Sequence, residues 1–171
     1  MLSMISRKLV MSGFLVIFSI SAAFARDAWI VCQDGARPVK IGMSLAKLNT
    51  VLHEKFRMPK NKGDQGCFYV KSKGHPHVLF MIEDGQLARV DVNAAGPATS
   101  KGVHVGDSEE RVKQIYGSAL QIGPHHYTDG HYLTIKSPSG WYGIRFETEK
   151  GKVERFYAGK FQSIQYVEGC Q

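Results

Sequence analysis

The sequence predicts an α+β fold of two tandem repeats, each a helix followed by an antiparallel hairpin, with the helices packed on one face of a sheet. Residues 40–44 (KIGMS) return as residues 104–108 (HVGDS), at an offset of 64. Residues 80–90 return as residues 146–156, at an offset of 66. Two matched segments in the same order indicate an internal duplication. Residues that both copies share are therefore expected to serve the architecture.

The chain begins with the pattern of a secretory signal peptide over residues 1–25. Arg7 and Lys8 precede an apolar run at residues 9–20, and Ala23 and Ala25 place small residues at the cleavage positions. The run is too short to span a bilayer, and no cysteine follows the cut directly. We expect cleavage after Ala25 and a periplasmic or secreted protein without a membrane span.

Cleavage would leave 146 residues with 20 basic and 15 acidic side chains, a net charge of +5. The chain has no run of five or six like charges of the kind found in nucleic-acid-binding tails. We expect no nucleic acid among its partners. The positive balance favours an acidic protein or an anionic envelope surface.

Three cysteines remain after cleavage, and export favours a disulfide between two of them. The pairing Cys67–Cys170 is preferred, because it would tie the end of the chain to a strand of the first repeat. Cys32–Cys67 is the alternative.

In the first repeat, Ser44 is placed to cap a helix. The apolar face of this helix is Leu45, Leu48, Val51, Leu52 and Phe56, and Pro59 ends it. Residues 67–71 are expected to form a strand. Alternating apolar residues on either side of Asp84-Gly85 predict a hairpin.

In the second repeat, Asp107 or Ser108 is expected to cap the helix, and Glu110 to complete a capping box. Gly117 follows the apolar face and is expected to end the helix. Residues 127–136 predict a strand pair or one bent strand, and Lys150-Gly151 predicts the hairpin turn.

Further strands are expected near residues 29–31, 39–41 and 164–167. We expect the first repeat at residues 26–93, a linker at 94–103 and the second repeat at 104–171. Two copies side by side would share one sheet, with its second face open for binding.

Gly106-Asp107-Ser108 matches the start of a GDS-type esterase site. The first repeat has Gly42-Met43-Ser44 at the same place, so the helix-capping interpretation is preferred. The sequence contains no phosphate loop, His-Glu-x-x-His pair or Cys-His nucleophile pattern. We expect no catalytic residue and no cofactor.

Six of the seven histidines lie between residues 75 and 131. Neutral imidazoles bind zinc or copper. However, Pro76 interrupts the strand that carries His75 and His77, and His125 and His126 would point to opposite faces. We expect no metal site, and the candidates for one are His75, His77, His125 and His131.

Aromatic residues are concentrated in the second repeat, and several have no apolar counterpart in the first. Exposed Tyr and Trp beside Arg would form a protein-binding hot spot or a sugar-stacking face. The predicted partner-binding residues are Tyr132, Trp141, Tyr142, Arg145 and Tyr157. Arg89 and Arg155 occupy equivalent positions and are expected to pair with Glu83 or Glu147 across the hairpins.

The repeated Ile-Gly-Met-Ser and Val-Gly-Asp-Ser helix starts resemble those of the β-lactamase-inhibitor-protein-like superfamily. In the arrangement of their expected helices and strands, residues 39–168 are similar to the SmpA/OmlA (BamE-like) domain. The resemblance implies helices packed on one face of an antiparallel sheet, and binding without catalysis. Residues 26–171 lack the lipoprotein cysteine of the SmpA/OmlA member.

We therefore expect a non-enzymatic, exported inhibitor or adaptor that binds an envelope or secreted protein. An acidic protein is one candidate for this partner. One alternative is an envelope or cell-wall structural or assembly protein. Another is a histidine-based metal-binding protein.

Overall fold

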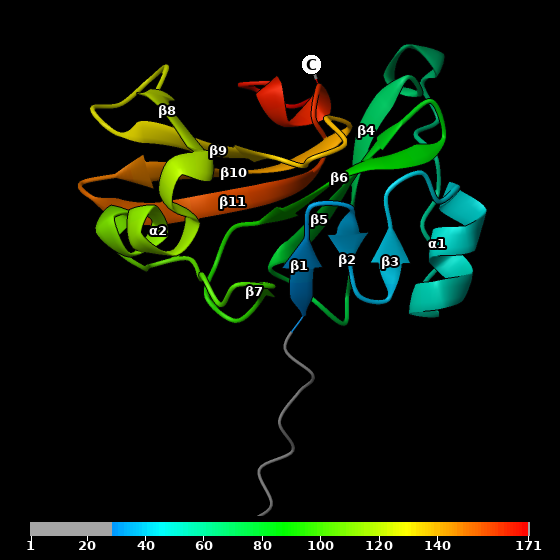
Figure 1. Ribbon diagram of the computed structural model, residues 1–171. Helices are drawn as coiled ribbons and strands as arrows, with labels where there is room; N and C mark the ends of the chain where they lie inside the picture. The colour runs from blue at the N-terminus through cyan, green and yellow to red at the C-terminus, as the bar shows by residue number, and fades with distance from the viewer. Residues whose placement is uncertain (1–28, 171) are drawn as a thin grey trace, which may run out of the picture.

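The computed structural model describes residues 29–170 and shows an α+β fold with one large and one small sheet (Figure 1). The predicted signal peptide lies outside these residues. None of the helices in the described part is long and apolar enough to cross a bilayer.

The large sheet has seven strands, all antiparallel, in the order β4-β5-β6-β11-β10-β9-β8. The two predicted hairpins are present, because β6 follows β5 and β11 follows β10 through turns with positive φ at both central residues. Pairing of β6 with β11 joins the two hairpins. The strands are β4 (Cys67–Lys71), β5 (Val78–Glu83), β6 (Gln86–Val92), β8 (Leu120–Pro124), β9 (His131–Lys136), β10 (Tyr142–Glu149) and β11 (Lys152–Lys160).

The small mixed sheet contains β3, β2, β1 and β7 in that order, with β1 parallel to β7. Its strands are β1 (Ile30–Cys32), β2 (Gly35–Ala36), β3 (Val39–Lys40) and β7 (Ala98–Thr99). Strand β7 lies inside the predicted linker, residues 94–103. Because β7 pairs with β1, this segment also holds the N-terminal strands in the small sheet.

Two α-helices, α1 (Leu45–Leu52) and α2 (Glu109–Tyr116), begin at the serines that the sequence indicated. Ser44 Oγ accepts from the Lys47 N–H at 3.2 Å, and Ser108 Oγ accepts from the Arg111 N–H at 3.2 Å. The predicted capping box is wrong, because the third helical residue of α2 is Arg111 and not Glu110. Gly117 ends α2 as predicted.

Helix α1 ends at Leu52, earlier than predicted, because His53 is left-handed. The side chain of Asn49 then holds Phe56 in the following loop, accepting from its N–H at 2.6 Å and donating to its carbonyl at 3.0 Å. Short 3₁₀ turns occur at η1 (Lys62–Asp64), η2 (Gly117–Ala119) and η3 (Ser163–Gln165).

The same backbone contacts join each helix start to its hairpin. The Gly42 N–H donates to the Leu87 carbonyl at 2.7 Å, and the Gly106 N–H donates to the Val153 carbonyl at 2.8 Å. Ser44 bridges to Gln86 on β6, as Ser108 bridges to Lys152 on β11.

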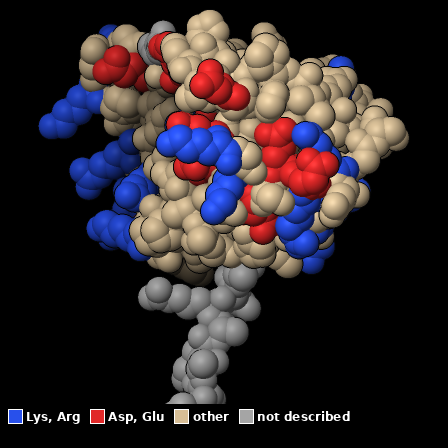
Figure 2. All heavy atoms as spheres, turned by 90° about the vertical axis from the view of Figure 1, so that its left-hand side faces the viewer, with Lys and Arg blue, Asp and Glu red and all other residues tan. Residues whose placement is uncertain are grey.

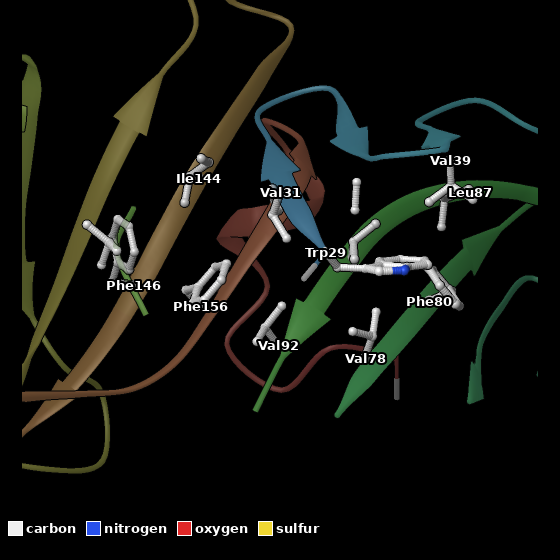
Figure 3. Close-up of a cluster of buried hydrophobic side chains, with 14 of the residues drawn as sticks. Trp29, Val31, Val39, Val78, Phe80, Leu87, Val92, Ile144, Phe146 and Phe156 are labelled. Atoms are coloured by element: carbon white, nitrogen blue, oxygen red, sulfur yellow. The ribbon is translucent and has the colours of Figure 1, made fainter. Parts of the chain in front are cut away.

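The hydrophobic core lies between the large sheet and the layer that contains α1, α2 and the small sheet (Figure 1). Leu48 and Val112 bring the two helices into it, and Trp29 packs against Phe80 with ring centroids 5.5 Å apart (Figure 3). We call this side of the large sheet the helix face. Turn η3 lies on the opposite side, the η3 face.

Candidate functional site

The predicted partner-binding residues do not lie on one surface. Side chains alternate along a strand, so Tyr142 shares the helix face with Ile144, whereas Arg145 lies on the η3 face. Tyr157 is only 1% exposed. Its ring packs under the guanidinium of Arg89, 4.2 Å from the centroid. Tyr157 is therefore not available to contact a partner, in contrast to the prediction.

Tyr157 and Arg155 both bind Glu147, which is buried. The Tyr157 hydroxyl donates to Glu147 Oε1 at 2.9 Å, and Arg155 Nε lies 3.2 Å from Oε2. Burial, together with the negative charge of Glu147, raises the pKa of Tyr157, so the phenol keeps its proton and donates. The predicted pairing of Arg155 with Glu147 is confirmed.

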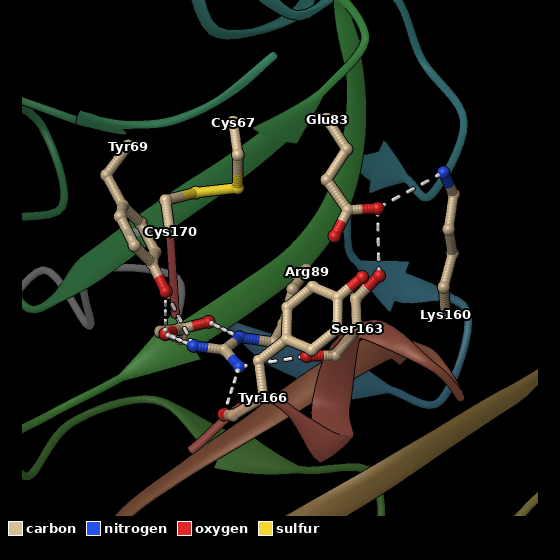
Figure 4. Close-up of a disulfide and its surroundings, with 9 residues drawn as sticks. Cys67, Tyr69, Glu83, Arg89, Lys160, Ser163, Tyr166 and Cys170 are labelled. Atoms are coloured by element: carbon tan, nitrogen blue, oxygen red, sulfur yellow. Dashed lines mark hydrogen bonds and ion pairs between the residues drawn. A yellow bond between two sulfur atoms is a disulfide. The ribbon is translucent and has the colours of Figure 1, made fainter. Parts of the chain in front are cut away.

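Arg89 is buried and pairs with Asp91 instead of Glu83, so the predicted pairing across the first hairpin is wrong. Its Nε and Nη2 lie 2.8 and 2.7 Å from the two carboxylate oxygens of Asp91. Its Nη1 donates to the carbonyls of Ser163 and Tyr166, at 3.0 and 3.4 Å (Figure 4). Arg89 therefore fixes the C-terminal segment on the sheet.

The predicted Cys67–Cys170 disulfide is confirmed (Figure 4). It attaches the end of the C-terminal segment to β4, while Cys32 has a free thiol. The strand expected near residues 164–167 is instead η3. The segment that contains η3 crosses the centre of the η3 face, and its carbonyls accept from Arg89. It lies over the strands and not along the edge of the sheet, so it cannot pair as a further strand. This face of the sheet is therefore covered at its centre and is not open.

Tyr132 and Arg145 belong to a packed layer on the η3 face. The Tyr132 ring stacks on His125, with centroids 4.6 Å apart and planes 28° apart, and the Arg145 guanidinium lies 4.9 Å from its centroid. Arg145 Nε donates to Thr134 Oγ1 at 2.9 Å, and its Nη2 donates to Gln165 Oε1. These contacts hold the C-terminal segment in place.

The histidines considered as metal ligands are not brought together. His125 Nε2 lies 3.2 Å from Glu147, His131 Nδ1 lies 3.1 Å from Glu109, and the His75 ring packs against Trp29 with centroids 4.4 Å apart and planes tilted by 44°. Over residues 29–170, no three His, Cys, Asp or Glu side chains converge as metal ligands would.

Glu109 is buried at the start of α2 and has three partners. It accepts from Thr148 Oγ1 at 2.9 Å and His131 Nδ1 at 3.1 Å, and Lys113 Nζ lies 2.9 Å away. Burial acts to raise the pKa of this carboxyl. The hydrogen bonds from Lys113, Thr148 and His131 outweigh it, so the net change is a lowered pKa.

A mainly apolar groove lies on the helix face beside the β9–β10 turn. Its volume is about 510 Å³, within the range of ligand-binding clefts. Its apolar lining comes from α2, β9 and β10: Tyr116, Ile135, Tyr142 and Ile144. Cys32 at the end of β1 and the β1–β2 turn that follows it line the groove as well. We call this feature the helix-face groove.

Trp141 stands in the turn beside the helix-face groove and is 76% exposed. It precedes Tyr142, and the other turn residues Ser137 and Pro138 also line the groove. Of the predicted partner-binding residues, Tyr142 is thus the one that lines the groove, and the exposed Trp141 precedes it in the chain.

Two lysines border this groove. Lys101 Nζ lies 4.9 Å from the centroid of the Tyr116 ring, and Lys136 Nζ lies 4.4 Å from that of Phe161. Neither lysine forms an ion pair within residues 29–170. Sequence reasoning missed Lys101, Tyr116 and Ile135, because tertiary packing alone brings them together.

No protein-family model matches this chain, and no curated protein matches it. Among solved structures, it is similar to YjgB of Bacillus subtilis, a DUF4309 family protein, with 13% identity and a TM-score of 0.48. The match covers 80% of this chain and 90% of that one. The predicted resemblance to the β-lactamase-inhibitor-protein-like superfamily and to the SmpA/OmlA domain is wrong, because no family model, of these families or of any other, matches this chain.

Proposed function

We propose that this chain is an exported, non-enzymatic module that binds an envelope or secreted protein, and that the helix-face groove receives a segment of that protein. The observation that carries the proposal is the apolar hollow that Tyr142 lines, with the exposed Trp141 directly before Tyr142 in the chain. Tryptophan is the residue type most enriched among binding hot spots, and such residues pair with pockets.

The groove offers an apolar floor for a partner's side chain. Tyr116, Ile135 and Ile144 line it and are part of the hydrophobic core, so they are held in fixed positions. Rigid aromatic and aliphatic surfaces lose little conformational entropy on binding. An apolar side chain inserted here would bury Tyr142, and a partner surface that extends past the groove would contact the neighbouring Trp141.

The charge at the groove indicates which partner segment would fit. Lys101 and Lys136 have no carboxylate partner within residues 29–170, so an acidic segment would supply one. We therefore propose a partner segment that combines an apolar anchor with acidic neighbours. Its association should slow as salt screens the charges.

We also propose that the two halves are tandem repeats, at residues 26–93 and 104–171, joined by residues 94–103. The equivalent contacts of Gly42 and Gly106 support this proposal. So do the equivalent caps at Ser44 and Ser108. Under this proposal Ser108 is an architectural residue, which agrees with a binding function and not with esterase chemistry.

The test is capture of a partner from periplasmic and secreted fractions with residues 26–171 as bait. We expect one stoichiometric protein that Trp141→Ala/Tyr142→Ala no longer retains. Tyr127→Ala is the matched control, because Tyr127 is 60% exposed but lies away from the groove. Equal capture by the double variant and the control would contradict the proposed site.

A further inference from the structure

The positive charge of this protein is concentrated at one end. Residues 47–73 contain seven basic side chains and two acidic ones, a net charge of +5. This equals the net charge of residues 26–171, so the rest of that stretch is balanced. We call the seven cations the basic end: Lys47, Lys55, Arg57, Lys60, Lys62, Lys71 and Lys73.

All seven cations are exposed, and none forms an ion pair within residues 29–170. The end of the molecule that carries α2 is different. There Lys113 pairs with Glu109 and Arg111 with Asp107, and Figure 2 shows basic and acidic side chains interspersed on that side. The seven cations of the basic end therefore lack the carboxylate partners that Lys113 and Arg111 have at the α2 end.

The fold holds the basic end together through Glu54. Its Oε1 accepts from the hydroxyl of Ser72 at 2.8 Å and from the N–H groups of Lys73 and Gly74 at 2.8 and 3.3 Å. These bonds fix the loop after α1 on the loop after β4. They place Lys55 and Lys73 in adjoining segments.

Met58 adds an apolar element to this positive surface. It is 46% exposed and lies between Arg57 and Lys60 along the chain. The neighbouring Phe56 is turned to the core and anchored by Asn49, with its ring 6.1 Å from Phe80. The loop thus presents its cations and one apolar side chain outward.

We propose that the basic end binds the surface of an anionic phospholipid bilayer. Lysine and arginine beside a negatively charged membrane each contribute about fivefold in binding, which corresponds to ~1 kcal/mol. An exposed apolar side chain among cations reaches into the headgroup region, as in interfacial membrane binding. This inference is independent of the proposed protein partner, because it uses residues away from the helix-face groove.

The first test is sedimentation of residues 26–171 with vesicles of phosphatidylglycerol and phosphatidylcholine. We expect binding that pure phosphatidylcholine does not support and that 1 M salt abolishes, since the Debye length then falls to about 3 Å. Lys55→Gln/Arg57→Gln should weaken binding roughly 25-fold. The charge-matched control Lys150→Asn/Lys152→Gln should change it less than threefold, and an equal loss in both variants would overturn the proposal.

The second test separates a bilayer from a soluble polyanion, with inorganic polyphosphate as the probe. Met58→Ala should weaken vesicle binding several-fold and leave polyphosphate binding unchanged, because polyphosphate has no apolar region. If Met58→Ala leaves vesicle binding unchanged, or if the protein binds polyphosphate but not the anionic vesicles, the bilayer proposal is overturned. Circular dichroism of each variant confirms folding.

Discussion

Arg89 Nη1 donates to the main-chain carbonyl of Ser163 at 3.0 Å, and so joins two residues that are 74 positions apart in the sequence. The same guanidinium forms a buried ion pair with Asp91. One side chain therefore links the centre of the large sheet to the segment that covers it. This link explains why the η3 face is covered at its centre, whereas the sequence predicts an open second face.

Removing Arg89 should strongly destabilise the fold. Arg89→Met would leave the carboxylate of Asp91 buried without its partner, which costs about 3–5 kcal/mol. Urea denaturation measures the loss. Lys40→Met is the control, since Lys40 and its partner Asp34 are both exposed and their pair should contribute only ~0–1 kcal/mol. Equal midpoints for the two variants would show that the buried pair is not essential.

The Cys67–Cys170 disulfide should contribute much of the stability. It joins residues 103 positions apart, and in the chain-entropy model a loop of this length stabilises by about 4–5 kcal/mol. Cys170→Ser should lower the free energy of unfolding by several kcal/mol. Cys32→Ser, which removes the free thiol, should change it much less. Mass spectrometry under non-reducing conditions checks the pairing itself, and a Cys32–Cys67 bond would contradict it.

Gly159 should not accept a side chain. An added Cβ would lie 2.2 Å from the carbonyl oxygen of Ala88 on the neighbouring strand β6, which is backbone and does not easily move. We expect Gly159→Ala to destabilise by roughly 1–3 kcal/mol or more. Gly66→Ala, where no atom lies within 4 Å of the added Cβ, serves as the control. Thermal unfolding of both variants makes the comparison.

Glu109 should make stability depend on pH in the acid range. Its folded-state pKa lies below the ordinary value of 4.5, so the folded protein binds fewer protons than the unfolded chain. Its contribution is complete above about pH 4.5 and is lost as the pH falls through the folded-state pKa. Glu109→Gln should therefore destabilise the protein more at pH 7 than at pH 3. A urea midpoint difference that is the same at both pH values would exclude this role.

Local signals in the sequence predicted local structure well. Asp84-Gly85 and Lys150-Gly151 form the expected hairpin turns, because Gly85 and Gly151 readily adopt the left-handed backbone that these turns need. Ser44 and Ser108 cap the helices, because each hydroxyl accepts from an N–H group of the first helical turn. The disulfide joins Cys67 to Cys170, which is the pairing that the sequence favoured. Strand β8 was missed, because its Gly-Pro end has no alternating pattern.

The candidate site was predicted less well, because its composition depends on contacts between distant segments. Tyr157 resembles an exposed aromatic in the sequence, and only the position of Arg89 above its ring shows that it is covered. The alternation of β10 places Tyr142 and Arg145 on opposite faces, which strand register alone decides. Tyr142 remains as the predicted residue that lines the groove, with the exposed Trp141 before it in the chain.

The binding account is tested most directly by the affinity of the captured partner for the Trp141→Ala variant, measured by isothermal titration calorimetry at 0.15 M salt. We predict a loss of about 30-fold or more, the size expected of a hot-spot residue at ~2 kcal/mol. Tyr127→Ala should bind like the unmodified protein. An unchanged affinity of Trp141→Ala would contradict the helix-face groove as the binding site.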